Sequence, residues 1–267
     1  MPFTLSHAAA VLPFRGFKPI WPALVIGTFA PDMQYFISLS NDERTWHRFP
    51  QVLLFAIPFG LISLWVFEHT FKAPVVKLLP NRVQQRLQHK LEPLSFAGSK
   101  QFLSIVLWIA VGIATHLVWD QFTHTYEWLP SHWALLQTTL RLPVGRSTLL
   151  AHFLQYVSSL GGFLVLCLWF AKWYRRTPPV PLSEQYPPRL KFTLVGGLVL
   201  AALLAGYPLA LIRLASHARP IPRHVFVTTV FEAVTLVFCI ELLIYSISLS
   251  LAGRSRRVSC VQPEEGD

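Results

Sequence analysis

The sequence contains little cysteine and little charge, and both shortages narrow the class of protein. Only 3 of its 267 residues are cysteines, and no two of them form a Cys-x-x-Cys pair. This excludes a disulfide framework and a cysteine-based zinc finger. Charged residues make up 13% of the chain, against about 25% in a typical soluble domain. The composition therefore argues against an ordinary soluble protein.

The signature motifs of several enzyme classes are also missing. The chain has no Gly-x-Ser-x-Gly elbow, no phosphate-binding P-loop and no His-Glu-x-x-His motif. The mechanisms that depend on these motifs therefore have no support in the sequence. The first residues lack a basic segment followed by a long apolar one, so we expect no cleaved signal peptide.

Long apolar runs dominate the chain instead, and 53% of its residues are hydrophobic. Five runs come close to the roughly 20 residues that cross a bilayer. They are residues 51–67, 102–119, 149–171, 192–212 and 225–251. A sixth stretch, 21–37, is interrupted by Pro31 and Asp32. We expect it to be buried or half-inserted, because non-helical backbone at membrane depth must be covered by protein or face water.

These runs predict an all-α fold, namely a polytopic membrane bundle of about five transmembrane helices with a partly buried N-terminal segment. We predict a single domain over residues 1–253 and a disordered C-terminal tail over residues 254–267, because the end of the chain is polar.

Positive charge is abundant, with a net charge of +10. In a soluble protein this excess would suggest nucleic-acid binding. Here the lysines and arginines lie between the apolar runs, where they contact anionic headgroups, so membrane lipids are the expected partner and nucleic acid is not. Alternate loops carry most of the basic residues. The positive-inside rule therefore predicts a cytoplasmic tail and an N-terminus on the outer side.

The most informative residues are His116, Asp120 and His124, at the end of the second apolar run. A helix turns about 100° per residue, so intervals of four place them along one stripe. Two imidazoles and a carboxylate are suitable ligands for a divalent metal such as zinc. Ionisable groups are costly to bury near a membrane span, which favours a functional role. The alternative is a helix end that has reached the headgroups and become polar.

Most of the ten histidines lie on the predicted outer side, among several acidic residues. This distribution favours a divalent metal such as zinc on that side. The alternative is that amphipathic histidines simply prefer interfaces. The histidines concerned are His7, His47, His116, His124, His132, His152, His217 and His224.

Four short motifs connect the chain to a known family. They are the opening Met-Pro-Phe-Thr-Leu-Ser-His7, the turn Gly27-Thr-Phe-Ala-Pro-Asp32, Trp46-His47, and Thr115-His116-Leu-Val-Trp-Asp120. On these residues the chain resembles domain-of-unknown-function family 4184 of bacterial membrane proteins. That family is similar to inner-membrane metal-dependent hydrolases. Its spaced ligands also resemble, more distantly, the pattern of zinc-dependent phospholipase C.

The resemblance implies a metal site with a defined set of ligands. The matching positions are His7, Asp32, His47, His116 and Asp120, and His124 matches a further ligand position. The phospholipase pattern also contains a His-x-x-x-Glu pair, but here His152 is followed four residues later by Tyr156. One or two metal ions are therefore expected rather than three.

These observations predict a membrane-embedded, metal-dependent hydrolase of the bacterial inner membrane, with its site on the outer side. The cofactor would be a divalent metal such as zinc, and the substrate a phosphoester or lipid-linked molecule at the membrane surface. Asp120 or Asp32 would act as the catalytic general base or as a ligand. The alternative is a metal-binding membrane protein or a transporter that catalyses no reaction.

Overall fold

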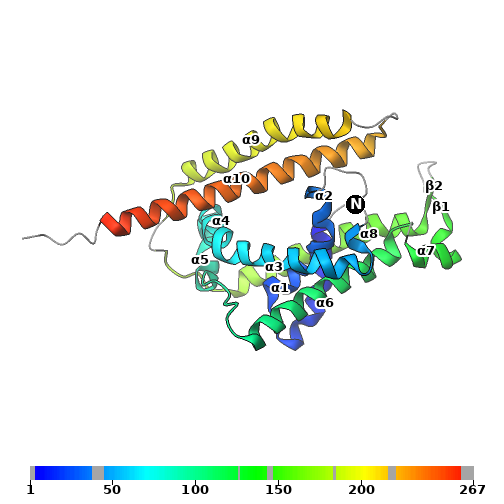
Figure 1. Ribbon diagram of the computed structural model, residues 1–267, viewed down its shortest axis with the longest axis horizontal. Helices are drawn as coiled ribbons and strands as arrows, with labels where there is room; N and C mark the ends of the chain where they lie inside the picture. Colours follow the sequence, from blue (N-terminus) through cyan, green and yellow to red (C-terminus); the bar gives the residue numbers. More distant parts are fainter. Residues whose placement is uncertain are drawn as a thin grey trace, which may run out of the picture. The chain divides into compact units, whose positions relative to one another are not determined.

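The computed structural model describes residues 4–37, 45–125, 127–142, 147–182, 185–215 and 221–259, and these residues are mostly helical (Figure 1). Five helical segments are long and apolar enough to cross a membrane. They are Val52–Leu78, Ser99–His132, Leu150–Arg176, Pro188–Ala215 and Val225–Ala252. This confirms the predicted all-α fold with five helices of spanning length, each of which overlaps one of the predicted apolar runs.

The long helices continue beyond the apolar runs that predicted them. Helix α6 is Ser99–Thr123, α8 is Leu150–Arg176, α9 is Pro188–Ala215 and α10 is Arg223–Ser259. The flanking lysines and arginines are good helix formers, so the backbone ladder continues through them. Helix α10 ends at Ser259 and so runs past residue 254, where we predicted the tail to begin, and residues 260–267 lie outside the described part of the chain.

The first span alternates between ordinary α-helical turns and wider π-helical turns. It consists of η4 (Val52–Ala56), α3 (Ile57–Val66), η5 (Phe67–Phe71) and α4 (Lys72–Leu78), of which η4 and η5 are π-helical. Each π-helical segment lies just before a proline, Pro58 or Pro74. Proline lacks an N–H and its ring presses on the carbonyl four residues earlier. A wider turn relieves that contact without ending the helix.

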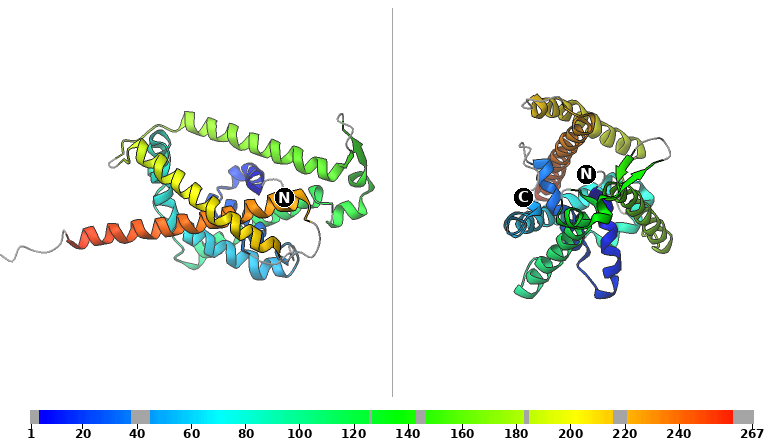
Figure 2. Two further views of the ribbon diagram at one scale, coloured as in Figure 1. Left: turned by 90° about the horizontal axis from the view of Figure 1, so that it is seen from above. Right: turned by 90° about the vertical axis from the view of Figure 1, so that its right-hand side faces the viewer.

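The chain forms two compact units. The first contains Met1–Leu64 and Ser95–Arg176, and the second contains Trp65–Leu94 and Thr177–Asp267. In the second unit α9 and α10 pack together and cross each other (Figure 2, left). A Cβ added to Gly206 of α9 would lie 2.6 Å from the Cα of Val234, so glycine is required at this crossing. The second unit also contains α5 (Asn81–Leu87) and η6 (Gln88–Lys90). The single domain over residues 1–253 stays a prediction.

The first unit begins with short elements, namely the 3-10 helix η1 (Thr4–Phe17), α1 (Trp21–Phe29), η2 (Ala30–Asp32), α2 (Met33–Ile37) and η3 (Thr45–His47). Of these, η1, α1 and η2 pack on α6, and η1 also packs on α8. Helix α1 lies directly against α6, where Gly27 meets Gly112. A Cβ on Gly27 would lie 2.3 Å from the Ile109 carbonyl oxygen, and one on Gly112 would lie 2.3 Å from that of Leu24. The N-terminal segment is therefore partly buried, as predicted.

One small element of the first unit was not predicted. Strands β1 (Thr139–Arg141) and β2 (Ser147–Leu149) form an antiparallel ribbon with Leu140 opposite Thr148. It follows α7 (Trp128–His132) and η7 (Ala134–Gln137), and α7 and the ribbon lie at the same end of α8 (Figure 1). Each strand has only three residues, too few for the alternation of apolar and polar residues to be recognised in the sequence.

Candidate metal centre

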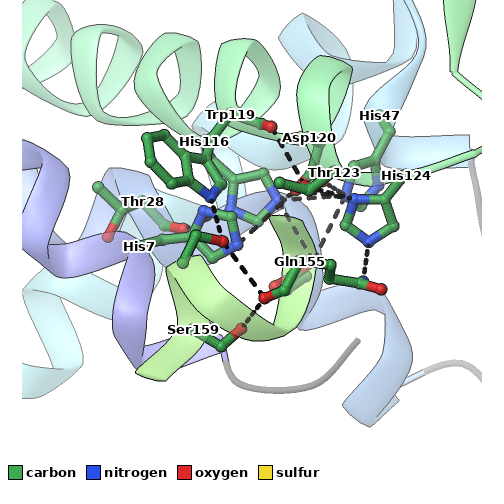
Figure 3. Close-up of polar contacts among 12 residues, drawn as sticks. His7, Thr28, His47, His116, Trp119, Asp120, Thr123, His124, Gln155 and Ser159 are labelled. Carbon is green, nitrogen blue, oxygen red and sulfur yellow. Dashed lines mark hydrogen bonds and ion pairs between the residues drawn. The ribbon is translucent and has the colours of Figure 1, made fainter. Parts of the chain in front are cut away.

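Six side chains proposed from the sequence meet in the first unit, and Figure 3 labels all of them except Asp32. They come from four separate elements and from the residue that follows α6. Helix η1 carries the first of them, the end of η2 the second, η3 the third, and α6 the next two. These residues are His7, Asp32, His47, His116, Asp120 and His124.

Four of the six place one atom each around a common point. The Nε2 atom of His116 lies 3.1 Å from Oδ2 of Asp120 and 3.4 Å from Oδ1 of Asp32. The Nε2 atom of His47 lies 3.4 Å from the same Asp32 oxygen and 3.6 Å from the same Asp120 oxygen. The two Nε2 atoms are 3.3 Å apart. The two imidazole nitrogens are therefore neighbours of each other, and each is a neighbour of one oxygen of Asp32 and one of Asp120.

The remaining two histidines contact the other oxygen of Asp120. The Nε2 atom of His7 lies 3.7 Å from Oδ1, and the Nδ1 atom of His124 lies 3.2 Å from it. The ring of His7 also stacks on that of His116, with 4.1 Å between the ring centroids. Asp120 is thus the one residue that all four histidines approach.

The carboxylate of Asp32 has an unusual environment. It is 0% exposed, and neither of its oxygens accepts a hydrogen bond from the residues that the structure describes. Burial opposes ionisation, but the adjacent His116 and His47 rings outweigh it and hold the pKa of Asp32 well below its usual range. An ionised, poorly hydrogen-bonded carboxylate in the interior is costly unless a cation neutralises it.

The histidine from the N-terminal segment is electrically neutral at physiological pH. Burial, together with the neighbouring His116, lowers the pKa of His7 to about 4. A neutral imidazole keeps a lone pair on one ring nitrogen, which is the form that binds a metal.

Backbone and amide groups orient two of the histidines. The Nδ1–H of His116 donates to the Thr28 carbonyl at 2.8 Å, so Nε2 is the ring nitrogen that faces the cluster. Gln34 holds η3 in place. Its Oε1 accepts the Trp46 backbone N–H at 2.9 Å, and its Nε2 lies 3.3 Å from Nδ1 of His47.

The residues that support the six side chains were not predicted from the sequence. Gln155 of α8 is buried, and its Nε2 lies 3.0 Å from Nε2 of His124. Ser6 anchors η1 beside His7 by donating from Oγ to the Ser159 carbonyl at 2.6 Å. The only sequence signal for Gln34 and Gln155 is that each is an amide within a largely apolar segment, which does not reveal a partner.

Other histidines singled out in the sequence have different contacts. His132 stacks on Trp128 with 4.5 Å between ring centroids, and His152 stacks on Tyr156 at 5.2 Å. Both are exposed, as expected for histidines at an interface. His217 lies outside the described residues, and the side chain of His224 is not described.

Comparisons with known proteins identify the family but give no activity. Among the curated proteins and among the solved structures, nothing matches the chain. One family model does match, and it covers residues 1–247, which is most of the sequence. The chain therefore belongs to the family described as Domain of unknown function (DUF4184).

Proposed function

We propose that this protein is a membrane-embedded, metal-dependent hydrolase whose divalent ion, best fitted by zinc, is held by His47, His116, Asp32 and Asp120. Its substrate is a phosphoester or a lipid-linked molecule at the membrane surface. The protein belongs in the bacterial inner membrane, with the metal centre on the outer side.

The distances among the four donor atoms carry this proposal. Zinc binds imidazole nitrogen and carboxylate oxygen at about 2.0–2.2 Å. Tetrahedral geometry then separates the ligand atoms from one another by roughly 3.3–3.5 Å. The separations between the two imidazole nitrogens, and between each nitrogen and each carboxylate oxygen, lie between 3.1 and 3.6 Å. The donor atoms thus have nearly the spacing of a tetrahedral zinc site.

Charge supports the same assignment. Asp32 and Asp120 are both buried, and each lies close to Nε2 of His116. A divalent cation would neutralise the charge of the two carboxylates. His7 adds no positive charge at neutral pH, since its pKa is lowered to about 4. A bound divalent ion would therefore supply the positive charge that two buried carboxylates need.

Hydrolysis is the reaction that such a centre supports best. Bound zinc polarises a phosphoryl oxygen and makes water acidic enough to attack near neutral pH. The chain supplies the proton acceptor, because Oδ2 of Asp32 is buried, close to the donor atoms, and accepts no hydrogen bond from described residues. Asp32 would then be both ligand and general base, with Asp120 as the other candidate.

One observation favours an alternative without catalysis. Four protein ligands close a tetrahedral zinc site, whereas catalytic sites usually keep one position for water. A metal-binding protein or transporter that catalyses no reaction would have such a closed set. The hydrolase needs zinc to accept a fifth ligand, which occurs in zinc enzymes.

Metal analysis and turnover of the purified protein test both functions. We expect tightly bound zinc, hydrolysis of a phospholipid or of p-nitrophenyl phosphate, and loss of both in Asp32→Asn, whose amide is a poor zinc ligand and no base. His152→Asn is the control, because its ring stacks on Tyr156. Bound zinc without turnover would favour the non-catalytic alternative, and a metal-free protein would contradict both functions.

A further inference from the structure

His124 has hydrogen-bond acceptors on one side of its ring and a donor on the other. Its Nδ1 atom lies 3.2 Å from Oδ1 of Asp120 and 3.1 Å from Oγ1 of Thr123. The Thr123 hydroxyl donates its own proton to the Trp119 carbonyl, so Oγ1 presents lone pairs to the imidazole. Both neighbours of Nδ1 are therefore acceptors, and the proton of the neutral ring belongs on Nδ1.

The opposite nitrogen confirms this assignment of the proton. The Gln155 amide donates from Nε2 to Nε2 of His124 at 3.0 Å, so that nitrogen must be bare. A histidine that binds a metal has the opposite arrangement of proton and lone pair. A ligating histidine turns a bare nitrogen to the ion and donates its other N–H to a carbonyl or carboxylate. His116 fits that rule through Thr28, whereas His124 turns an N–H toward the cluster.

His47 resembles His124 superficially but differs in two respects. Its contact with the Gln34 amide is 3.3 Å long, against 3.0 Å between Gln155 and His124. Its Nε2 atom also has close contacts with three donor atoms, on Asp32, His116 and Asp120. His47 therefore stays in the ligand set.

We propose that Gln155 and His124 form a positioning pair, in which Gln155 sets the tautomer of His124 so that its Nδ1–H faces Oδ1 of Asp120, 3.2 Å away. That contact holds the carboxylate with its other oxygen, Oδ2, toward His116 at 3.1 Å and His47 at 3.6 Å. This pair depends on the proposed metal centre and gives His124 a role beside the ion, in which it orients a ligand and does not bind the ion.

The pair also explains a buried amide within a membrane helix. Gln155 and His124 are each less than a tenth exposed, and an unpaired polar group there would be costly. The two residues are 31 positions apart in the sequence and belong to different helical segments. The contact therefore links the start of α8 to the end of α6 at the metal centre.

Cobalt spectroscopy distinguishes a positioning residue from a ligand. The visible absorption of bound Co²⁺ depends on its ligands. We expect His124→Asn and Gln155→Leu to weaken Co²⁺ binding by about 10- to 100-fold, with an unchanged spectrum at saturating cobalt. The double variant should bind no more weakly than His124→Asn, because Gln155 acts through His124. Gln137→Leu is the control, since that amide bonds only the Pro130 carbonyl.

Nuclear magnetic resonance of the metal-free protein gives an independent test. With ¹⁵N-labelled histidine, His124 should show a protonated Nδ1 in the wild type. Gln155→Glu should move the proton to Nε2, because a carboxylate there accepts instead of donating. A changed cobalt spectrum in His124→Asn, or a wild-type proton on Nε2, would overturn the proposal. If the wild type bound no cobalt, the metal centre itself would fail, and the resonance test would still decide the role of Gln155.

Discussion

The Nδ1 atom of His116 lies 2.8 Å from the carbonyl oxygen of Thr28. This bond joins α6 to α1 across 88 positions of sequence, and it leaves Nε2 of His116 free to meet Asp32 and Asp120. It forms because Gly27 and Gly112 let the two helices touch backbone to backbone. The geometry of the candidate metal centre thus depends on two glycines outside it.

Substitution of Gly112 by alanine should therefore damage the centre from a distance. The added Cβ would lie 2.3 Å from the Leu24 carbonyl oxygen, so α1 must move away and take Thr28 with it. Overpacking of this kind costs about 1–3 kcal/mol. We expect a lower melting temperature and at least about tenfold weaker zinc binding, measured by calorimetry. Gly161→Ala in α8 is the control, because its Cβ would meet nothing within 4 Å.

Removal of the Asp120 side chain should abolish zinc binding while leaving membrane insertion intact. All four histidines approach this carboxylate, so Asp120→Ala removes a ligand and the anchor of the others. His132→Ala should change zinc affinity little, because that ring stacks on Trp128 at the surface. Isothermal titration with Zn²⁺ on both variants checks this, and undiminished affinity in Asp120→Ala would show that the residue is no ligand.

The lowered pKa of His7 predicts a pH-dependent stability of the metal-free protein. The ordinary pKa of histidine, 6.5, falls to about 4 in the folded chain. The unfolded chain therefore binds the proton first as the pH falls, and folding is weakened between pH 6.5 and pH 4. At pH 5 this amounts to about 2 kcal/mol. Thermal unfolding in chelator at pH 7 and pH 5 should show a larger drop for the wild type than for His7→Asn, and equal drops would contradict the shift.

Cysteine labelling can test the predicted orientation. In a cysteine-free background, Leu5→Cys and Leu135→Cys should react with a membrane-impermeant maleimide from the outer side. Both positions are more than half exposed, and two spans separate them. Lys90→Cys, in the segment between those spans, should react only after the membrane is permeabilised. Labelling of positions 5 and 135 from opposite sides would refute the five-span topology.

Local patterns in the sequence predicted much of the helical structure. Runs of apolar residues predict spanning helices because every backbone polar group in a bilayer must be paired within the segment. Likewise, His116 and Asp120 share a stripe because their spacing is a property of one helix. The sequence did not indicate the π-helical turns of the first span or the three-residue strands, since both depend on contacts that composition does not record.

The sequence by itself determined which residues have metal-binding chemistry, and the motifs named His7, Asp32 and His47 as well as the stripe on α6. Only the tertiary structure brought these segments together, since His47 and His116 are 69 positions apart and their 3.3 Å contact depends on how the short N-terminal elements pack against α6. The tertiary structure alone also distinguished the roles of the histidines. An imidazole ring has the same composition whether it turns a lone pair or an N–H toward a carboxylate, and the choice is made by its far-side partner, Thr28 for His116 and Gln155 for His124.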